Sequence, residues 1–184
     1  MEPGLRTIFF PMDPYVALAR LSIHHWVRRQ APMREIPEDI AMALAGQRAA
    51  VFVSLHTPDG ELRGCMGTLQ PVHEEVSEEI IANAATACAR DPRFPPVWAA
   101  ELEHLDIKVD VLSEMELTER TQLDPRRYGV LVSAPDGRRG VLLPDLEGVD
   151  TVDEQIAIAC RKAGIDPVGD RYALQRFTVV RHEE

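Results

Sequence analysis

Aromatic residues are scarce in this chain of 184 residues: two Trp, three Tyr and five Phe make up 5% of it. Basic residues are also outnumbered, with 20 Lys and Arg against 30 Asp and Glu, so the net charge is −10. A negatively charged chain is repelled by nucleic-acid phosphates, and so few rings cannot form a surface on which bases stack. The composition therefore argues against nucleic acid as a partner.

Only three cysteines occur, Cys65, Cys88 and Cys160, and none of them belongs to a CxxC pair. An odd, widely spaced set does not suit a disulfide framework or a zinc knuckle, and it favours a cytoplasmic location. The histidines do not cluster with cysteines or carboxylates at the spacing of metal ligands. We therefore expect no metal site and no cofactor.

Long hydrophobic runs are absent, and none approaches the roughly 18 residues that a membrane-spanning helix needs. The first ten residues, MEPGLRTIFF, lack the basic flank and the apolar core of a signal peptide. Apolar content is nevertheless ordinary, at 45%, which excludes a disordered chain. These features predict a chain that folds around a core and has no membrane partner, either as a monomer or as a homodimer.

The N-terminal half begins with a helix and a hairpin. Asp13 followed by Pro14 is typical of a helix start and predicts a helix over 13–30. The turn Pro58-Asp59-Gly60 then joins two strands, because proline presets one backbone angle and glycine accepts the positive φ that closes the turn. The predicted strands span 49–56 and 61–70.

A long helix and a third strand follow the hairpin. The helix is predicted over 74–90, since Val76, Ile80, Ala84 and Cys88 recur every four residues on one face. Apolar and polar residues then alternate over 105–111, which predicts a strand with one dry and one wet face.

The second half of the chain repeats this order of elements. Pro135-Asp136-Gly137 repeats the first turn, and Arg139-Gly140 repeats Arg63-Gly64. A second helix from about 151 places Cys160 where the first helix has Cys88. In both halves a turn, a strand and a helix follow in the same order, and an Asp-Pro pair comes after the helix. This shared order predicts two β-β-α-β repeats, roughly 49–113 and 128–181.

Neither repeat could bury its own sheet alone. We therefore expect an α+β fold in which both repeats form one curved, barrel-like, mostly antiparallel sheet with the helices packed outside. This fold would make residues 1–184 a single domain. A Rossmann fold is excluded because no Gly-rich turn joins a strand to a helix.

The most unusual segment is Leu62–Thr68, with the sequence LRGCMGT. Alternation along a strand places Arg63, Cys65 and Gly67 on one face. A guanidinium near a thiol lowers the pKa of that thiol, and Gly64 and Gly67 would leave space above the sulfur. Cys65 is therefore the candidate nucleophile. The alternative is that Cys65 is a small core side chain and Arg63 a surface ion-pair partner.

Three further residues are candidates for binding: Thr68 at the end of this segment, Asn83 on the inner flank of the long helix, and Arg93 in the loop behind it. That loop could fold back over the sheet near Cys65. We prefer the alternative that it is a proline-stiffened connection with Phe94 anchored in the core. Asn83 could bind a ligand or only a backbone group.

Three motifs, LRGCMGTLQP, DPRFPPV and LDIKVDVLS, together resemble the AMMECR domain family, called protein A of the AmmeMemoRadiSam system in prokaryotes. The family hallmark is similar to LRGCIGT, with Met66 here in place of isoleucine. The family block DxRFPPL is matched with Val97 in place of the last leucine. The resemblance runs from about Pro14 to Arg181 and includes residues 137–144 and 161–164.

This resemblance implies a duplicated α+β unit around one barrel-like sheet, in agreement with the repeats. It also implies Memo-like and radical SAM proteins as partners, and it places the suspected functional site around Cys65. It implies no particular reaction.

Two functional hypotheses remain open. In the first, the chain is an enzyme or a ligand-binding protein, with Cys65 as nucleophile, Arg63 holding an anionic group and His56 as the base. In the second, it is a non-catalytic subunit that docks on its partners, with Phe94 and Trp98 as anchors.

Overall fold

A computed structural model describes residues 12–183 of the chain. The ten N-terminal residues that we inspected for a signal peptide lie outside this range. The chain divides into two compact units, of which the second comprises 112–180 and the first the described residues on either side of it. The fold is α+β, with helices packed on sheets whose strand pairs are antiparallel wherever their register is defined.

The first unit is built from α1 (Pro14–Arg29), α2 (Glu38–Leu44), α3 (Val76–Ala89) and a short 3-10 helix, η1 (Ala99–His104). Its sheet has the order β2-β1-β3-β8. The four strands are β1 (Ala50–His56), β2 (Leu62–Gly67), β3 (Asp106–Leu112) and β8 (Val179–His182).

The start of α1 follows the prediction. The Asp13 side chain accepts a hydrogen bond from the Tyr15 N–H at 2.9 Å, and Pro14 occupies the first helical position. The helix ends at Gln30, which adopts the left-handed conformation and donates its N–H to the Trp26 carbonyl. Asp13 also accepts from His182 Nδ1 at 2.7 Å, which connects the beginning of α1 to β8.

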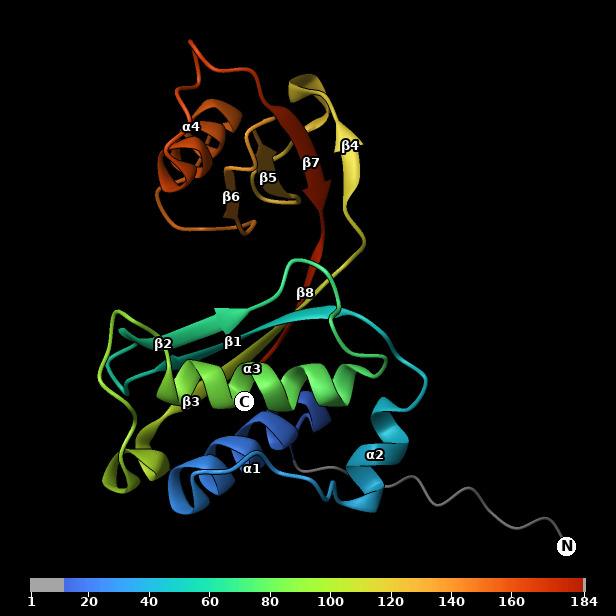
Figure 1. Ribbon diagram of the computed structural model, residues 1–184, viewed down its shortest axis with the longest axis vertical. Coiled ribbons are helices and arrows are strands. Elements are labelled where there is room, and N and C mark those ends of the chain that lie inside the picture. The colour runs from blue at the N-terminus through green and yellow to red at the C-terminus, as the bar shows by residue number, and fades with distance from the viewer. Residues whose placement is uncertain (1–11, 184) are drawn as a thin grey trace, which may run out of the picture. The chain divides into compact units, whose positions relative to one another are not determined.

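Helix α3 is the centre of the first unit. It packs against β1 and β2 on one side and against α1 on the other, as Figure 1 shows. The sequence pattern predicted a single buried face, but this helix also buries Ile81, Ala85 and Ala87 because it lies between two layers.

The second unit has a smaller core around one helix, α4 (Val152–Ala163), which packs on β5 and β6. Its sheet has the order β4-β7-β5-β6. The strands are β4 (Glu116–Thr118), β5 (Gly129–Ser133), β6 (Arg139–Leu142) and β7 (Ala173–Phe177), and a short 3-10 helix, η2 (Arg120–Gln122), follows β4.

The two repeats are visible in the strand order. Within each unit, the hairpin and the strand after the helix lie in the same arrangement, β2-β1-β3 and β6-β5-β7. Each set of three strands is completed by a fourth strand that follows the last strand of the other set in sequence. Strand β8 follows β7 and pairs with β3, and strand β4 follows β3 and pairs with β7.

This exchange corrects two expectations. The single barrel-like sheet is not confirmed: the described strands form two four-stranded sheets, and neither closes on itself. The last strand of the second repeat, which was predicted to run to about 181, is two strands in two different sheets, separated at Thr178. Each repeat covers its sheet with its own helix, so no shared sheet is needed to bury the apolar faces. That residues 1–184 form one domain remains a prediction.

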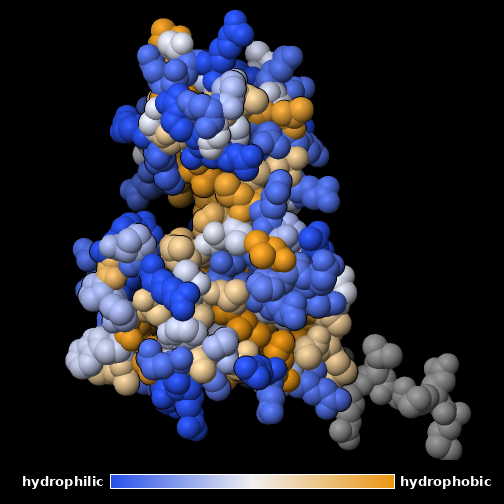
Figure 2. Space-filling view, viewed as in Figure 1, coloured by the Kyte–Doolittle hydropathy of each residue, from blue (hydrophilic) through white to orange (hydrophobic). Residues whose placement is uncertain are grey.

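The described part of the chain has no helix that is long and apolar enough to cross a membrane. The face seen in Figure 2 is mostly hydrophilic, with hydrophobic residues gathered in small patches.

Candidate functional site

Strand β2, which carries the LRGCMGT segment, is an edge strand of the first sheet. Gly64 pairs with Leu55 and lies on the face that α3 covers. A Cβ on Gly64 would stand 2.5 Å from the Ala87 carbonyl oxygen of that helix. This glycine therefore lets the helix backbone approach the strand.

Gly67 also has a packing role. A Cβ there would lie 2.6 Å from the Val51 carbonyl oxygen and would overlap the Phe52 ring. We expected the two glycines to leave space above the Cys65 sulfur, and this was wrong. The space beside each glycine is filled by neighbouring protein atoms.

The exposed edge of β2 at Cys65 is covered by two side chains of the loop after α3. The Cys65 N–H donates to Asp91 Oδ2 at 2.9 Å, and Arg93 Nη2 donates to the Cys65 carbonyl at 3.3 Å. Asp91 and Arg93 thus satisfy the backbone groups of Cys65 as a neighbouring strand would.

Asp91 and Arg93 are tightly joined. The Asp91 carboxylate accepts from the Arg93 Nε at 2.9 Å, from its Nη2 at 2.7 Å and from its backbone N–H at 3.0 Å. The Arg93 guanidinium holds the pKa of the buried Asp91 carboxyl far below its usual range, and the Cys65 N–H lowers it further. Asp91 is therefore charged at any physiological pH.

The thiol of Cys65 lies on the face of the sheet opposite to α3. Cys65 is half-buried, and its direct partner on β1 is Ser54, whose side chain points to the same face. Asp91 is the main cause of a raised pKa at Arg93, but the Cys65 side chain also contributes to it. The guanidinium beside this thiol is thus that of Arg93, whose side chain is 55% exposed.

Arg63 does not play the role that we expected. Its Nε and Nη2 donate to the Glu101 carboxylate at 2.7 and 3.0 Å, and its Nη1 donates to the Pro95 carbonyl at 3.0 Å. Only 12% of its side chain is exposed. Burial opposes the charged form of Glu101, but hydrogen bonds from Arg63 and from the Trp98 N–H lower the pKa of Glu101 overall. Arg63 therefore fixes the loop after α3 against β2.

Thr68 and Asn83 meet at a buried carboxylate. Glu79 of α3 is 1% exposed and accepts from the Thr68 hydroxyl and from the N–H groups of Val72 and His73, at 2.9 and 3.0 Å. Asn83 donates to the Val51 carbonyl at 3.3 Å, which is the backbone role left open by the sequence. These side chains hold the chain that leaves β2.

The candidate base, His56, pairs with Leu62 at the end of the hairpin. Its Nε2 lies 3.2 Å from the Ser54 hydroxyl, and its Nδ1 lies 3.4 Å from the Gly60 carbonyl. Since Ser54 stands opposite Cys65, His56 is connected to the neighbourhood of the thiol through one side chain.

The other two cysteines differ sharply from Cys65. Cys88 and Cys160 are buried in the cores of the two units. Burial raises the pKa of the Cys88 thiol to about 12 and also raises the pKa of Cys160. Within residues 12–183, no three His, Cys, Asp or Glu side chains are grouped so that they could hold a metal ion.

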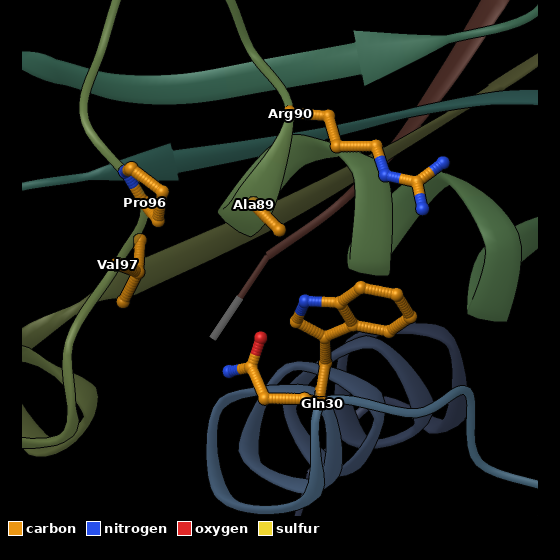
Figure 3. A pocket seen from close by; sticks show the side chains of 6 residues that line it. Gln30, Ala89, Arg90, Pro96 and Val97 are labelled. Atoms are coloured by element: carbon orange, nitrogen blue, oxygen red, sulfur yellow. The ribbon is translucent and has the colours of Figure 1, made fainter.

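The loop that carries Asp91 and Arg93 also borders a hollow of about 230 Å³. Figure 3 shows Gln30 directly after α1, Arg90 directly after α3, and Pro96 and Val97 of the loop around it. The Arg90 guanidinium lies 5.6 Å from the centre of the Trp26 ring. Val97 anchors this loop in the core, whereas Phe94, which we expected there, is only half-buried.

Asp91, Glu79 and Glu101 are the residues of this region that sequence reasoning missed. Asp91 stands in the DPRFPPV block, where it was interpreted as a helix stop. Glu79 lies in the first turn of α3, and nothing in the local sequence distinguishes it from the exposed Glu78.

The fold and the site together define a class: an α+β protein made of two β-β-α-β units with exchanged fourth strands, in which a cysteine on an edge strand is held by an Asp-x-Arg loop. The AMMECR1 family model matches residues 16–182. The chain belongs to the AMMECR1 family.

Relatives of known sequence and structure agree with this assignment. The chain is 47% identical over 173 residues to Protein CA_C1420 of Clostridium acetobutylicum, which is 94% of this chain but 36% of that protein. A protein of Thermotoga maritima is 46% identical over 171 residues, 92% of this chain and 97% of that protein. The crystal structure of the uncharacterized protein PH0010 from Pyrococcus horikoshii has a TM-score of 0.82 at 31% identity, covering 92% of this chain and 89% of that chain. The chain thus spans about a third of the Clostridium relative and nearly all of the Thermotoga one.

Proposed function

We propose that the face of β2 opposite to α3 carries a thiol-centred site, in which Cys65 acts as a nucleophile toward a small anionic substrate. The observation that carries the proposal is the exposed Arg93 guanidinium beside Cys65, fixed there by the buried Asp91. A fixed positive charge favours the thiolate over the thiol, and the thiolate is the nucleophile.

Arg93 takes the role first considered for Arg63 because the Arg63 guanidinium is already engaged by Glu101 and the Pro95 carbonyl. The base available to the site is His56, acting through Ser54. Memo-like and radical SAM proteins remain the proposed partners, and the cytoplasm the proposed location, on the grounds given by the sequence.

The first test is the pH dependence of alkylation. We expect iodoacetamide to modify Cys65 with an apparent pKa below the usual value of about 8.5, and Arg93→Gln to raise that value by roughly one unit. Cys88 and Cys160 should stay unmodified in the folded protein because they are buried. Peptide mass spectrometry identifies the modified cysteine.

Arg48→Gln is the matched control, since it removes the same charge from an exposed arginine of the first unit whose partner is Glu74. A second comparison uses iodoacetate, which is anionic. The rate ratio of iodoacetate to iodoacetamide should fall in Arg93→Gln and not in Arg48→Gln. An apparent pKa at or above 8.5 in the wild-type protein would refute the proposal.

A second candidate function is docking on a partner, and one observation favours it. The Trp98 side chain is 66% exposed, yet its backbone N–H is fixed by Glu101 at 2.9 Å, and Glu101 is held by Arg63. An exposed tryptophan on a rigid backbone is typical of an interface anchor.

Co-purification with Memo-like and radical SAM proteins tests this candidate. Trp98→Ala should reduce capture at least tenfold, whereas Leu117→Ala, which truncates an exposed residue of the second unit, should not. Equal capture by both variants would exclude Trp98 as the anchor.

A further inference from the structure

A second hollow lies wholly within the second unit, and none of the residues of the thiol site lines it. Its volume is about 330 Å³. The polar residues that line it are Ser113, Glu116, Arg127, Tyr128, Arg176 and Thr178, and Phe177 closes it from the core side.

Two guanidinium groups face one ring in this hollow. The Arg176 guanidinium carbon is 4.6 Å from the centre of the Tyr128 ring, and that of Arg127 is 5.0 Å from it. Two like charges over one ring repel each other, and the repulsion grows as water is excluded. Such a pair is stabilised by an anion that contacts both groups.

Arg176 is only partly satisfied by the protein. Its Nη1 donates to the Gln122 carbonyl at 3.1 Å, and its Nη2 reaches the exposed Glu116 carboxylate at 3.4 Å. Charge-assisted hydrogen bonds between arginine and a carboxylate are normally 2.7–2.9 Å, so the pair with Glu116 is loose. The Arg176 Nε is buried and has no hydrogen-bond partner, which is costly for a charged group.

Arg127 is an exposed arginine with no carboxylate within ion-pair distance among residues 12–183. Its neighbour in sequence, Arg126, pairs with Asp150 at 3.7 Å. In a chain with a net charge of −10, an arginine that lies over an aromatic ring and has no carboxylate partner among the described residues is unusual. Ser113 and Thr178 also line this hollow.

We infer that this hollow is a binding site for an oxyanion, a carboxylate or a phosphate group, which Arg127 and Arg176 hold against the Tyr128 ring. Two arginines supply several N–H donors in the planar arrangement that such oxygens accept. The buried, unpartnered Arg176 Nε and the loose pair with Glu116 leave this guanidinium short of partners, which an anion bound at its other nitrogens would compensate. The size of the hollow limits the ligand to a small molecule or to one anionic group of a larger one.

The inference is independent of the thiol site, because no residue is shared between the two. It is tested by titrating the full chain with inorganic phosphate and, separately, with benzoate, at low ionic strength. Isothermal calorimetry gives the affinity, and the side-chain Nε–H signal of Arg176 in a ¹⁵N-labelled sample reports the contact.

We expect saturable binding of at least one of the two anions, together with a shift of the Arg176 Nε–H signal. Arg127→Gln should weaken binding at least tenfold. Arg126→Gln, which removes the same charge one residue away, should change it less than twofold. Binding of phosphate alone, of benzoate alone or of both identifies the class of oxyanion.

Two results would overturn the inference. One is the absence of saturable binding of both anions by the wild-type chain. The other is an equal loss of affinity in Arg126→Gln and Arg127→Gln, which would mean that the anions respond only to general surface charge. Circular dichroism of each variant verifies that it is folded.

Discussion

Two Asp-x-Arg pairs show how burial changes the contribution of the same local interaction to stability. Asp91 bonds the N–H and the guanidinium of Arg93, and Asp136 bonds the same groups of Arg138. Asp91 is buried and also holds the Cys65 N–H, whereas Asp136 is exposed in a turn. An exposed ion pair contributes little to stability because water screens both charges.

We therefore predict that Asp91→Asn lowers the free energy of unfolding at pH 7 by about 1–3 kcal/mol, because it leaves Arg93 and the edge of β2 without a charged acceptor. Asp136→Asn should lower it much less. Since the folded protein holds the pKa of Asp91 far below the unfolded value of about 3.9, this stabilisation is complete above pH 4.

The stabilisation from Asp91 is lost as the pH falls from 4 through the folded pKa, because the carboxylate must then bind a proton. The difference between wild type and Asp91→Asn should therefore shrink between pH 4 and pH 2. Urea unfolding at several pH values measures it. A difference that does not change with pH would contradict the assigned role of the charge.

At the scale of elements, the repeats share one device for packing a helix on a hairpin. Gly64 of β2 lies against the Ala87 carbonyl of α3, and Gly140 of β6 lies against the Ala159 carbonyl of α4. The two glycines occupy the matching Arg-Gly positions of the two repeats. The helix backbone can approach the strand this closely only where no Cβ stands between them.

We predict that Gly64→Ala and Gly140→Ala each lower the free energy of unfolding by roughly 1–3 kcal/mol, because the helix must move away from the sheet. Arg139→Ala is the control, since it truncates the adjacent, exposed side chain of β6. Thermal or urea unfolding measures all three. An unchanged free energy of unfolding in Gly140→Ala would show that α4 does not pack closely on β6.

At the scale of the whole molecule, strand β8 (residues 179–182) joins the sheet of the first unit, although it follows the second unit in sequence. Arg181 of β8 donates to the buried Asp110 of β3 through Nε at 2.8 Å and Nη2 at 3.1 Å. The second unit contains all the strands of its own sheet, whereas the first needs β8 from the end of the chain.

We predict that Arg181→Gln destabilises the first unit selectively, because it leaves the Asp110 charge buried with weaker compensation. Amide hydrogen exchange should accelerate in β1 and β3 by tenfold or more and stay unchanged in β5 and α4. Arg171→Gln, at an exposed position, is the control. Equal acceleration in both units would show that they unfold together.

Several features of the fold followed directly from the sequence. The N-terminal helix, both hairpins, the two long helices and the duplication were predicted because their signals are local: a cap, a turn or a periodic apolar pattern. The LRGCMGT segment was also identified as unusual, although its glycines make room for atoms of the protein itself and not for a ligand above the thiol.

Other features could not be predicted from local patterns. The sheet that accepts the last strand, and the separation of β7 from β8 at Thr178, depend on which edge is free to pair after the helices have packed. The choice of Arg93 over Arg63 as the cation beside Cys65 depends on Glu101, which lies 38 residues from Arg63 in sequence.

The sequence by itself determined the order of the elements, their doubling and the family, because caps, turns and periodicities act over a few residues. Only the tertiary structure decided which strands share a sheet, which carboxylates are buried and which guanidinium stands beside the thiol. Those outcomes depend on contacts between segments that are distant in sequence, and no short stretch of sequence specifies such contacts. Burial strengthens the charge pairs that form there because water no longer screens them.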